Sequence, residues 1–250
     1  MDGDEEFDES VAGLTGLLLA HRPLQETLTH VAEYAVHAIP GAEGAGLTLL
    51  EANRPQTVVA TAEFVREVDR IQYDVVEEGP CLSAVNERRT FTSGNLGGAS
   101  QWPRFGPRVG RLGVHSALSL PLLMPDRVLG ALNVYAHGRD VFGEQAVLLG
   151  EAFAPHAAAS VYNAQLLAQA DRVIAQLQQA LQTRAEIDQA VGLLMSRTGL
   201  DAESARARLR EMSQTSSVKV SDLARDMLDS AVWRARARSA QPTQSGDEPD

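Results

Sequence analysis

The spacing of apolar residues divides this 250-residue chain into helical and extended stretches. Between Ser10 and Ile39 apolar residues recur at helical spacing. Pro23 marks the start of a second helix there, and Pro40-Gly41 closes it, so we expect two helices. The pattern then changes to short extended runs, which predict strands at residues 45–50, 57–61, 116–123 and 128–135.

Turn residues and further helices connect these predicted strands. The turn at residues 124–127 joins the last two runs into a hairpin. Helical stretches are expected at about residues 62–73 and 80–88, and a segment rich in Gly and Pro follows at 94–113. Strands and helices mixed in this way predict an α+β domain whose antiparallel sheet is flanked by helices.

From Gly143 onward the pattern is helical for a long way, and from Leu166 apolar positions alternate by four and three residues. This heptad seam consists of Leu166, Ala170, Val173, Leu177, Ala180, Arg184, Ile187, Val191 and Leu194. A seam this narrow usually meets a partner helix, so we predict a coiled-coil linker over 164–184 and a parallel homodimer. A buried Arg184 would weaken the coil where a signal could alter helix packing. The alternative is that the helix continues undisturbed and the charged end of the Arg184 side chain extends out of the seam into water.

Two shorter helices follow and complete a small module. Asp201 is a good N-cap for the first, and Ser216-Ser217 breaks the chain before the second. Their apolar stripes contain Ala205, Leu209 and Met212, and then Val220, Leu223, Ala224, Met227, Leu228 and Ala231. Three short helices are too small a module for a catalytic cleft, which favours an interaction role.

Charge and composition restrict the classes of function. The formal net charge of −11 argues against a protein that coats nucleic acid without specificity. The charge is uneven, because residues 176–238 hold ten basic and eight acidic side chains, so a polyanion should meet this part. There is no run of about 18 apolar residues, and the acidic start does not resemble a secretory signal. We therefore expect a cytoplasmic protein without a membrane partner.

Both ends of the chain are polar and lack an apolar pattern. Residues 1–9 form an acidic tail, and residues 239–250 are rich in Ser, Gln, Pro and Asp. Both are predicted to be disordered, because such segments cannot bury enough apolar surface to offset the entropy of ordering.

One motif in the C-terminal module is specific. It consists of Ala185-Glu186-Ile187-Asp188-Gln189-Ala190-Val191-Gly192-Leu193-Leu194-Met195, then Gly199-Leu200, Ala205, Leu209-Arg210, Ser213 and Ala224. Over residues 176–235 it strongly resembles the ANTAR domain of antiterminator proteins. The resemblance implies that a dimer binds leader RNA with paired, small-looped hairpins and so prevents a terminator hairpin from forming.

Candidate RNA-binding residues follow from this resemblance and from a strip of basic and hydroxyl side chains. Such a strip suits phosphates and unstacked loop bases, although without the resemblance a solvated face is the plainer interpretation. Gly192 has no side chain, so it either lets RNA approach the helix backbone closely or only relieves crowding between helices. Val191 and Arg206 stand where the family often has a lysine and an aromatic residue, which predicts an altered RNA preference. The candidates are Gln189, Gly192, Arg197, Arg206, Arg208, Arg210, Ser213 and Lys219.

The preceding part of the chain carries a second set of motifs: Gln72-Tyr73, Glu78-Gly79-Pro80-Cys81, Trp102-Pro103-Arg104-Phe105, and the runs 116–123 and 130–135. These resemble a GAF domain of the kind that precedes ANTAR modules in actinobacteria, and they assign residues 10–163 to a sensory domain. The resemblance implies the fold but identifies neither a ligand nor a cofactor. The candidate residues for a small-molecule or protein effector are Cys81, Trp102, Phe105 and His115, although a cysteine such as Cys81 is more often a small buried residue and Trp102 is expected to be a lid or core residue.

An enzyme is the least supported class. The sequence has no Walker loop, dinucleotide fingerprint, zincin motif or nucleophile elbow. Its single cysteine, Cys81, cannot form an internal disulfide or a cysteine-based zinc site. We predict a sensor that binds leader RNA and is not an enzyme. The alternatives are a dimeric signalling module whose helical tail contacts a protein, and a Cys81-dependent reductase.

Overall fold

The computed structural model describes residues 2–20, 22–51 and 54–239 of the chain. These form two compact units, Met1–Ala170 and Asp171–Asp250, and the long helix α6 (Glu144–Thr198) belongs to both. Among the described helices, none combines the length and apolar character needed to cross a membrane.

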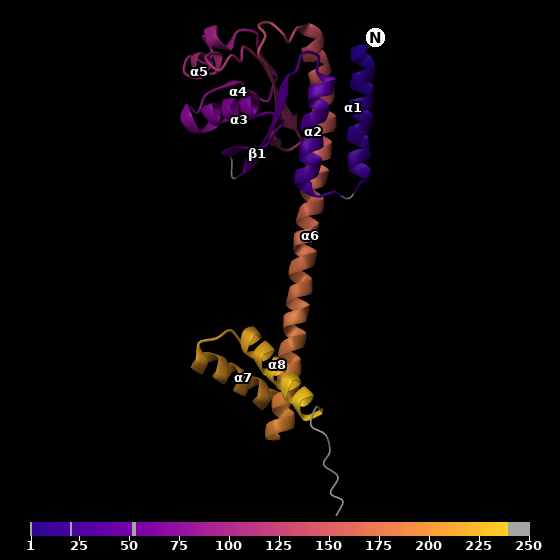
Figure 1. The fold of residues 1–250 in the computed structure, drawn as a ribbon, viewed down its shortest axis with the longest axis vertical. Coiled ribbons are helices and arrows are strands. Elements are labelled where there is room, and N and C mark those ends of the chain that lie inside the picture. The colour runs from indigo at the N-terminus through magenta and orange to yellow at the C-terminus, as the bar shows by residue number, and fades with distance from the viewer. Residues whose placement is uncertain (1, 21, 52–53, 240–250) are drawn as a thin grey trace, which may run out of the picture. The chain divides into compact units, whose positions relative to one another are not determined.

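The first unit is built on an antiparallel sheet with strand order β2-β1-β5-β4-β3 (Figure 1). The predicted hairpin is confirmed, because β4 and β5 pair with Leu120 opposite Leu132. The three-residue strand β3 was not predicted, since it is too short to show an alternating pattern. The strands are β1 (Gly44–Glu51), β2 (Arg54–Ala60), β3 (Phe91–Ser93), β4 (Ser116–Leu123) and β5 (Val128–Ala136).

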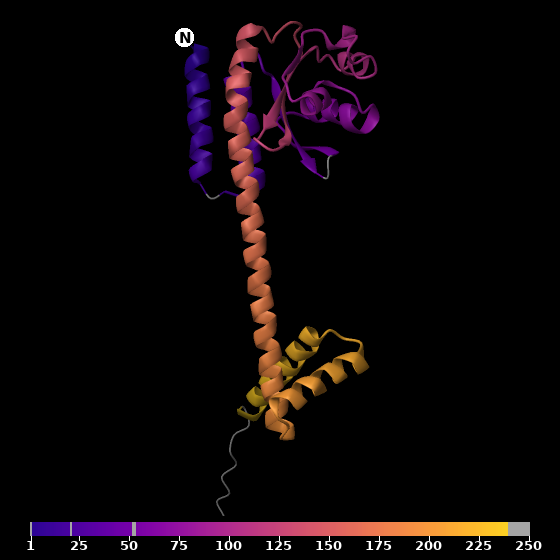
Figure 2. The ribbon, with the colours of Figure 1, turned by 180° about the vertical axis from the view of Figure 1, so that it is seen from behind.

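Helices cover both faces of this sheet. On one face lie α2 (Leu24–Ala38) and the first part of α6, with α1 (Asp2–Leu19) outside them (Figures 1 and 2). The other face carries the shorter elements: α3 (Glu63–Arg70), the π-helix η1 (Ile71–Val75), α4 (Pro80–Glu87), the 3-10 turn η2 (Leu96–Gly98) and α5 (Gly106–Gly110). This arrangement confirms the α+β class.

Strand periodicity decides which side chains meet each layer. In β4, Leu118, Leu120 and Leu122 pack toward the long helices, whereas Ala117, directly before Leu118, faces the short ones. Leu132 of β5 joins the first group and is fully buried. Burying a leucine side chain of this kind stabilises the fold by roughly 1.5–3 kcal/mol.

The N-terminal segment differs from the expectation of a disordered tail at residues 1–9, because α1 is helical from Asp2. Its apolar stripe includes Phe7 and Leu14, and Leu14 is only 1% exposed. Tyr34 of α2 approaches Gly13 so closely that a Cβ there would lie 2.5 Å from the Tyr34 ring. Tertiary packing thus stabilises a helix that the acidic composition obscured. Of the disordered tail that the sequence predicts at 239–250, residues 240–250 lie outside the described part of the chain.

The second unit is a three-helix module made by the end of α6, α7 (Ala202–Ser216) and α8 (Val220–Ser239). The N-cap prediction is confirmed, since the backbone N–H of Ser204 donates to Asp201 Oδ1 at 2.8 Å. Ser217 adopts a left-handed conformation with φ of 55° and ends α7. The small core of this module is formed by Ala190, Val191, Leu194, Ala205, Leu209 and Ala224.

Candidate ligand cavity and nucleic-acid interface

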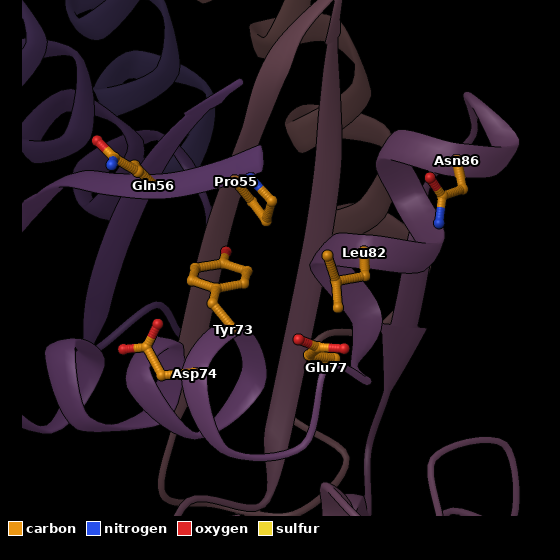
Figure 3. A pocket seen from close by; sticks show the side chains of 7 residues that line it. All are labelled: Pro55, Gln56, Tyr73, Asp74, Glu77, Leu82 and Asn86. Carbon is orange, nitrogen blue, oxygen red and sulfur yellow. The ribbon is translucent and has the colours of Figure 1, made fainter. Parts of the chain in front are cut away.

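A cavity of about 710 Å³ lies on the face of the sheet that the short helices cover. Its lining comes from three separate places in the chain: the start of β2, the π-helix with the loop after it, and α4. Figure 3 shows the Tyr73 ring at the centre of this group. The lining residues are Pro55, Gln56, Tyr73, Asp74, Glu77, Leu82 and Asn86.

The backbone beside the cavity is irregular. Residues Ile71–Val75 form a π-helix, a rare widened turn that is frequent at functional sites. Glu77, two residues later, has a φ of 51°, in the left-handed region. At Gly79 a Cβ would lie 2.1 Å from Gln72 Oε1, so only glycine leaves room for that carbonyl to accept from the Cys81 backbone N–H at 2.9 Å.

Behind Tyr73 lies a group of polar side chains that we call the polar cluster: Thr48, Asp69, Gln72, Tyr73, Ser119, Asn133 and Tyr135. The hydroxyls of Tyr73 and Thr48 are 2.8 Å apart, and Asn133 Nδ2 donates to Tyr73 Oη at 3.4 Å. Tyr135 Oη donates to Asp69 Oδ1 at 2.8 Å. Except for the half-buried Tyr73, these side chains are buried, so Tyr73 alone joins the cluster to the cavity.

Part of this hydrogen-bonding capacity is unused. Within the described part of the chain, Gln72 Nε2, Ser119 Oγ and Asn133 Oδ1 are buried and have no partner. Leaving such a group unpaired costs about 1–3 kcal/mol, and native structures usually satisfy it with protein, water or ligand. The cluster therefore offers a bound molecule both a donor and an acceptor.

Burial also sets the ionisation of the cluster. It raises the pKa of Tyr73 and of Tyr135 well above the ordinary value, with the nearby Asp69 carboxylate acting in the same direction. Burial likewise raises the pKa of the Cys81 thiol to about 12. Both hydroxyls and the thiol are therefore neutral at physiological pH, and Cys81 is not an activated nucleophile.

The residues expected to hold an effector do not line the cavity. Cys81 is fully buried next to the polar cluster. Trp102 is 3% exposed and donates from Nε1 to Ser83 Oγ at 3.0 Å, and Phe105 is fully buried in the same core. His115 precedes β4 and has a buried Nδ1 without a partner in the described structure. Trp102 and Phe105 are thus core residues.

Sequence reasoning missed most of the polar cluster. Gln72-Tyr73 and the runs 116–123 and 130–135 carried the resemblance to a GAF domain, but the sequence assigned no binding role to Thr48, Ser119 or Asn133. Each is a polar residue inside an otherwise apolar strand, on the face opposite the long helices. That break in composition was the available signal.

The basic residues of α7 are exposed, as expected. Arg206 pairs with Asp188 Oδ1 at 2.7 Å, and Arg208 pairs with Glu211 Oε2 at 2.7 Å. Arg210 and Lys219 form no ion pair with any described residue, and Arg197 is exposed in the last turn of α6. Exposed ion pairs contribute only about 0–1 kcal/mol, so Arg206 and Arg208 could exchange their partners for phosphate.

Ser213 corrects the expected RNA-binding set. It is 8% exposed, and its hydroxyl donates to the Val218 carbonyl, which closes the turn between α7 and α8. It therefore stabilises the module and does not face solvent. Gln189 and Gly192 are exposed on α6, and a Cβ at Gly192 would meet nothing within 4 Å. Relief of crowding within this chain thus does not explain that glycine.

The heptad seam has two different environments. Val191 and Leu194 are buried in the three-helix module, whereas Val173 is 47% and Leu177 60% exposed in the single chain. Arg184 is also exposed, with its side chain at 81%. An open groove follows this part of α6 and is lined by Gln176, Gln179, Ala180, Thr183, Arg184, Ile187 and Arg206.

Comparison with known proteins agrees with the division of the chain into two units. A GAF domain model matches residues 21–161, and an ANTAR domain model matches residues 175–228. No curated protein matches the chain.

Three solved structures each resemble about two thirds of this chain. The GAF domain of a phosphoenolpyruvate-protein phosphotransferase from Coxiella burnetii has a TM-score of 0.52 at 16% identity, covering 65% of this chain and 96% of that one. The corresponding domain from Acinetobacter has 0.50 at 14% identity, covering 65% and 97%. A free methionine-R-sulfoxide reductase from Neisseria meningitidis, solved with its substrate, has 0.50 at 13%, covering 64% and 90%. At these identities the likeness shows the fold alone.

Proposed function

We propose that this chain, which belongs to the GAF domain family and carries an ANTAR domain behind its GAF domain, senses a signal and controls transcription termination by binding structured leader RNA. The domain pair is that of a regulatory protein of the antitermination kind. The exposed basic face of α7, held beside a folded three-helix core, carries the RNA part of the proposal.

Phosphate contacts are assigned to Arg206 and Arg210, which lie one helical turn apart on α7, and to Lys219 just before α8. Arg210 and Lys219 have no competing ion pair in the described structure, so neither must give up a carboxylate to bind RNA. Gln189 and Gly192 on α6 leave an open surface where an unstacked base could approach the backbone.

A parallel homodimer through α6 would cover the exposed part of the heptad seam. Val173, Leu177 and the groove beside Ala180 would then pack against the same residues of a second copy. Arg184 lies 3.9 Å from Asp188 in this chain and would keep a partner at the edge of such a coil.

The signal is assigned to the cavity in front of Tyr73. Asp74 and Glu77 are the charged side chains of its lining, so an anion would be repelled there and a neutral or cationic small molecule is favoured. A ligand that reaches Asn133 Oδ1 would have to displace the Tyr73 hydroxyl. It would shift RNA binding only by as much as it prefers one arrangement of the protein over another.

A protein of this design has no need of catalysis, and the thiol chemistry argues against a reductase. The reaction of a thiol with a sulfoxide produces an oxidised cysteine that a second thiol must reduce, and Cys81 has none in this chain. Its pKa of about 12 also leaves very little thiolate near neutral pH.

A gel-shift assay tests the RNA proposal. The probe is an RNA with two short-looped hairpins, and the control RNA has scrambled loops. We expect loop-dependent binding that weakens by at least about fivefold in Arg210→Ala, as for the loss of a phosphate contact of about 1 kcal/mol. The matched control is Arg111→Ala, which removes an exposed arginine from the GAF domain. Equal binding of both RNAs by the wild-type protein would contradict the proposal and favour a protein partner for the helical tail.

A further inference from the structure

The C-terminal helix α8 carries a large aromatic side chain that its own module does not use. Trp233 is 71% exposed, whereas the other tryptophan, Trp102, is 3% exposed in the core of the GAF domain. Trp233 also lies beyond residues 175–228, which the ANTAR domain model matches. Neither the core nor the family match therefore accounts for it.

Helix geometry places Trp233 away from the bundle. Successive residues of a helix turn by about 100°, so Trp233 points to the side of α8 opposite the buried Ala224. Met227, on the buried side of the same helix, packs against the core instead. No rotation of α8 about its axis could bury both Ala224 and Trp233 in the module.

The surroundings of Trp233 are open and become basic toward the end of the helix. Asp229, Ser230, Trp233 and Arg234 line a depression on the surface. Arg234 Nε donates to the Ser230 carbonyl at 3.1 Å, which lays its side chain back along the helix beside the ring. Arg236 is exposed three residues beyond Trp233. Residues 229–236 thus combine one flat ring, two guanidinium groups and one carboxylate.

We propose that Trp233 is a stacking platform for an unpaired RNA base, with Arg234 and Arg236 contacting the adjoining phosphates. The proposal rests on the RNA-binding function and adds a second contact site to it. Aromatic rings interleaved with basic side chains suit single-stranded RNA, because every base has a π-face and every nucleotide a negative charge. Because Asp229 lines the same depression, the phosphates would lie on the side of the ring that carries Arg234 and Arg236.

Charge favours RNA over a second copy of the chain at this face. A twofold contact brings a patch against itself. Two arginines and one aspartate leave each patch with a net positive charge, so such a contact would accumulate like charge around the two rings. A polyanion neutralises the same charge and also covers the ring.

The experiment uses the full-length chain and the two-hairpin RNA, with Trp233→Ala and Trp233→Phe as variants. We expect RNA to quench tryptophan fluorescence in the wild-type protein, and Trp233→Phe to remove that quenching while binding within a few-fold of wild type. Trp233→Ala should bind roughly five- to hundredfold more weakly, the range for loss of one stacked base. Arg225→Ala, on the same helix but in an ion pair with Glu186, is the control and should bind as wild type does.

The other outcomes are distinguishable. Loop-dependent binding that neither quenches Trp233 nor weakens in Trp233→Ala would overturn the stacking site and leave the RNA-binding function intact. A shift from dimer to monomer in Trp233→Ala, measured by sedimentation equilibrium without RNA, would assign this face to contact between copies and overturn the proposal. If no protein discriminates the RNA from its loop-scrambled control, the proposed function itself fails.

Discussion

The thiol of Cys81 lies fully buried beside the hydroxyl of Tyr73, and burial raises its pKa from the ordinary 9.0 to about 12. Between pH 9.0 and about 12 the thiol is therefore neutral in the folded protein but ionised in the unfolded chain. Its contribution to stability is therefore complete below pH 9.0 and is lost as the pH rises toward about 12.

The first prediction concerns this pH range. The free energy of unfolding should fall more steeply above pH 9.0 in the wild-type protein than in Cys81→Ala, by up to about 1.4 kcal/mol per pH unit. Urea unfolding at a series of pH values measures the difference. Tyr73 and Tyr135 are present in both proteins, so their ionisation affects both curves. Parallel curves would show that the thiol is not buried in solution.

The hydroxyl of Tyr73 provides a second prediction at this scale. Tyr73→Phe removes the contact with Thr48 at 2.8 Å and leaves the buried Thr48 hydroxyl only the long hydrogen bond from Asn133 Nδ2 at 3.5 Å, so unfolding should become easier by about 1–3 kcal/mol. Tyr162→Phe is the matched control, because its hydroxyl makes no hydrogen bond within the described residues. Urea unfolding measures the loss of stability in each variant. Equal losses in Tyr73→Phe and Tyr162→Phe would mean that the Tyr73 hydroxyl does not form a stabilising hydrogen bond with the polar cluster.

At the scale of elements, α6 serves two cores. Its last turns contribute Ala190, Val191 and Leu194 to the three-helix module. Earlier in the same helix Val173 and Leu177 remain about half exposed. One heptad seam, apolar except at Arg184, thus supplies an intramolecular core at one end and a free surface at the other. Only the packing of α7 and α8 distinguishes these two ends.

The third prediction tests the free part of this seam. Leu177→Glu should convert a dimer to a monomer, because two carboxylates would face each other across a parallel coil. Gln178→Glu, the same charge on the neighbouring and exposed position, should leave the dimer unchanged. Sedimentation equilibrium measures the mass of each. A wild-type monomer, or a Leu177→Glu dimer, would contradict a dimer through α6.

For the whole molecule, the net negative charge opposes the RNA binding that is proposed for its C-terminal end. The chain carries a net charge of −11, but residues 176–238 hold ten basic and eight acidic side chains and so carry a small positive charge. RNA binding would therefore depend on a few local phosphate contacts, while the rest of the molecule repels the polyanion at long range and less so as salt screens it.

The fourth prediction follows from this balance. Each protomer's Arg206, Arg210 and Lys219 should together contribute about −2 to the slope of the logarithm of the association constant against the logarithm of salt concentration. Arg210→Ala should reduce the steepness of that slope by roughly 0.7. Fluorescence anisotropy over a salt series measures both slopes. An unchanged slope in the variant would show that Arg210 does not contact phosphate.

Local patterns determined much of the secondary structure by themselves. Helical and alternating spacings, the turn before β5 and the Asp201 cap predicted elements that the structure contains, because these signals act within a few residues of the chain. The motifs around Gln189 and Gln72 likewise indicated both domain families. Such features need no knowledge of what packs where.

Only the tertiary structure decided which of these residues are available for function. Pro55, Tyr73 and Leu82 meet at one cavity from three separate elements, and no spacing in the sequence places them together. Trp102 and Ser213 were candidate binding residues in the sequence, yet packing buries both. The converse holds for Trp233, which remains exposed. Burial depends on contacts between distant segments, so a residue's chemistry is visible in the sequence but its surroundings are not.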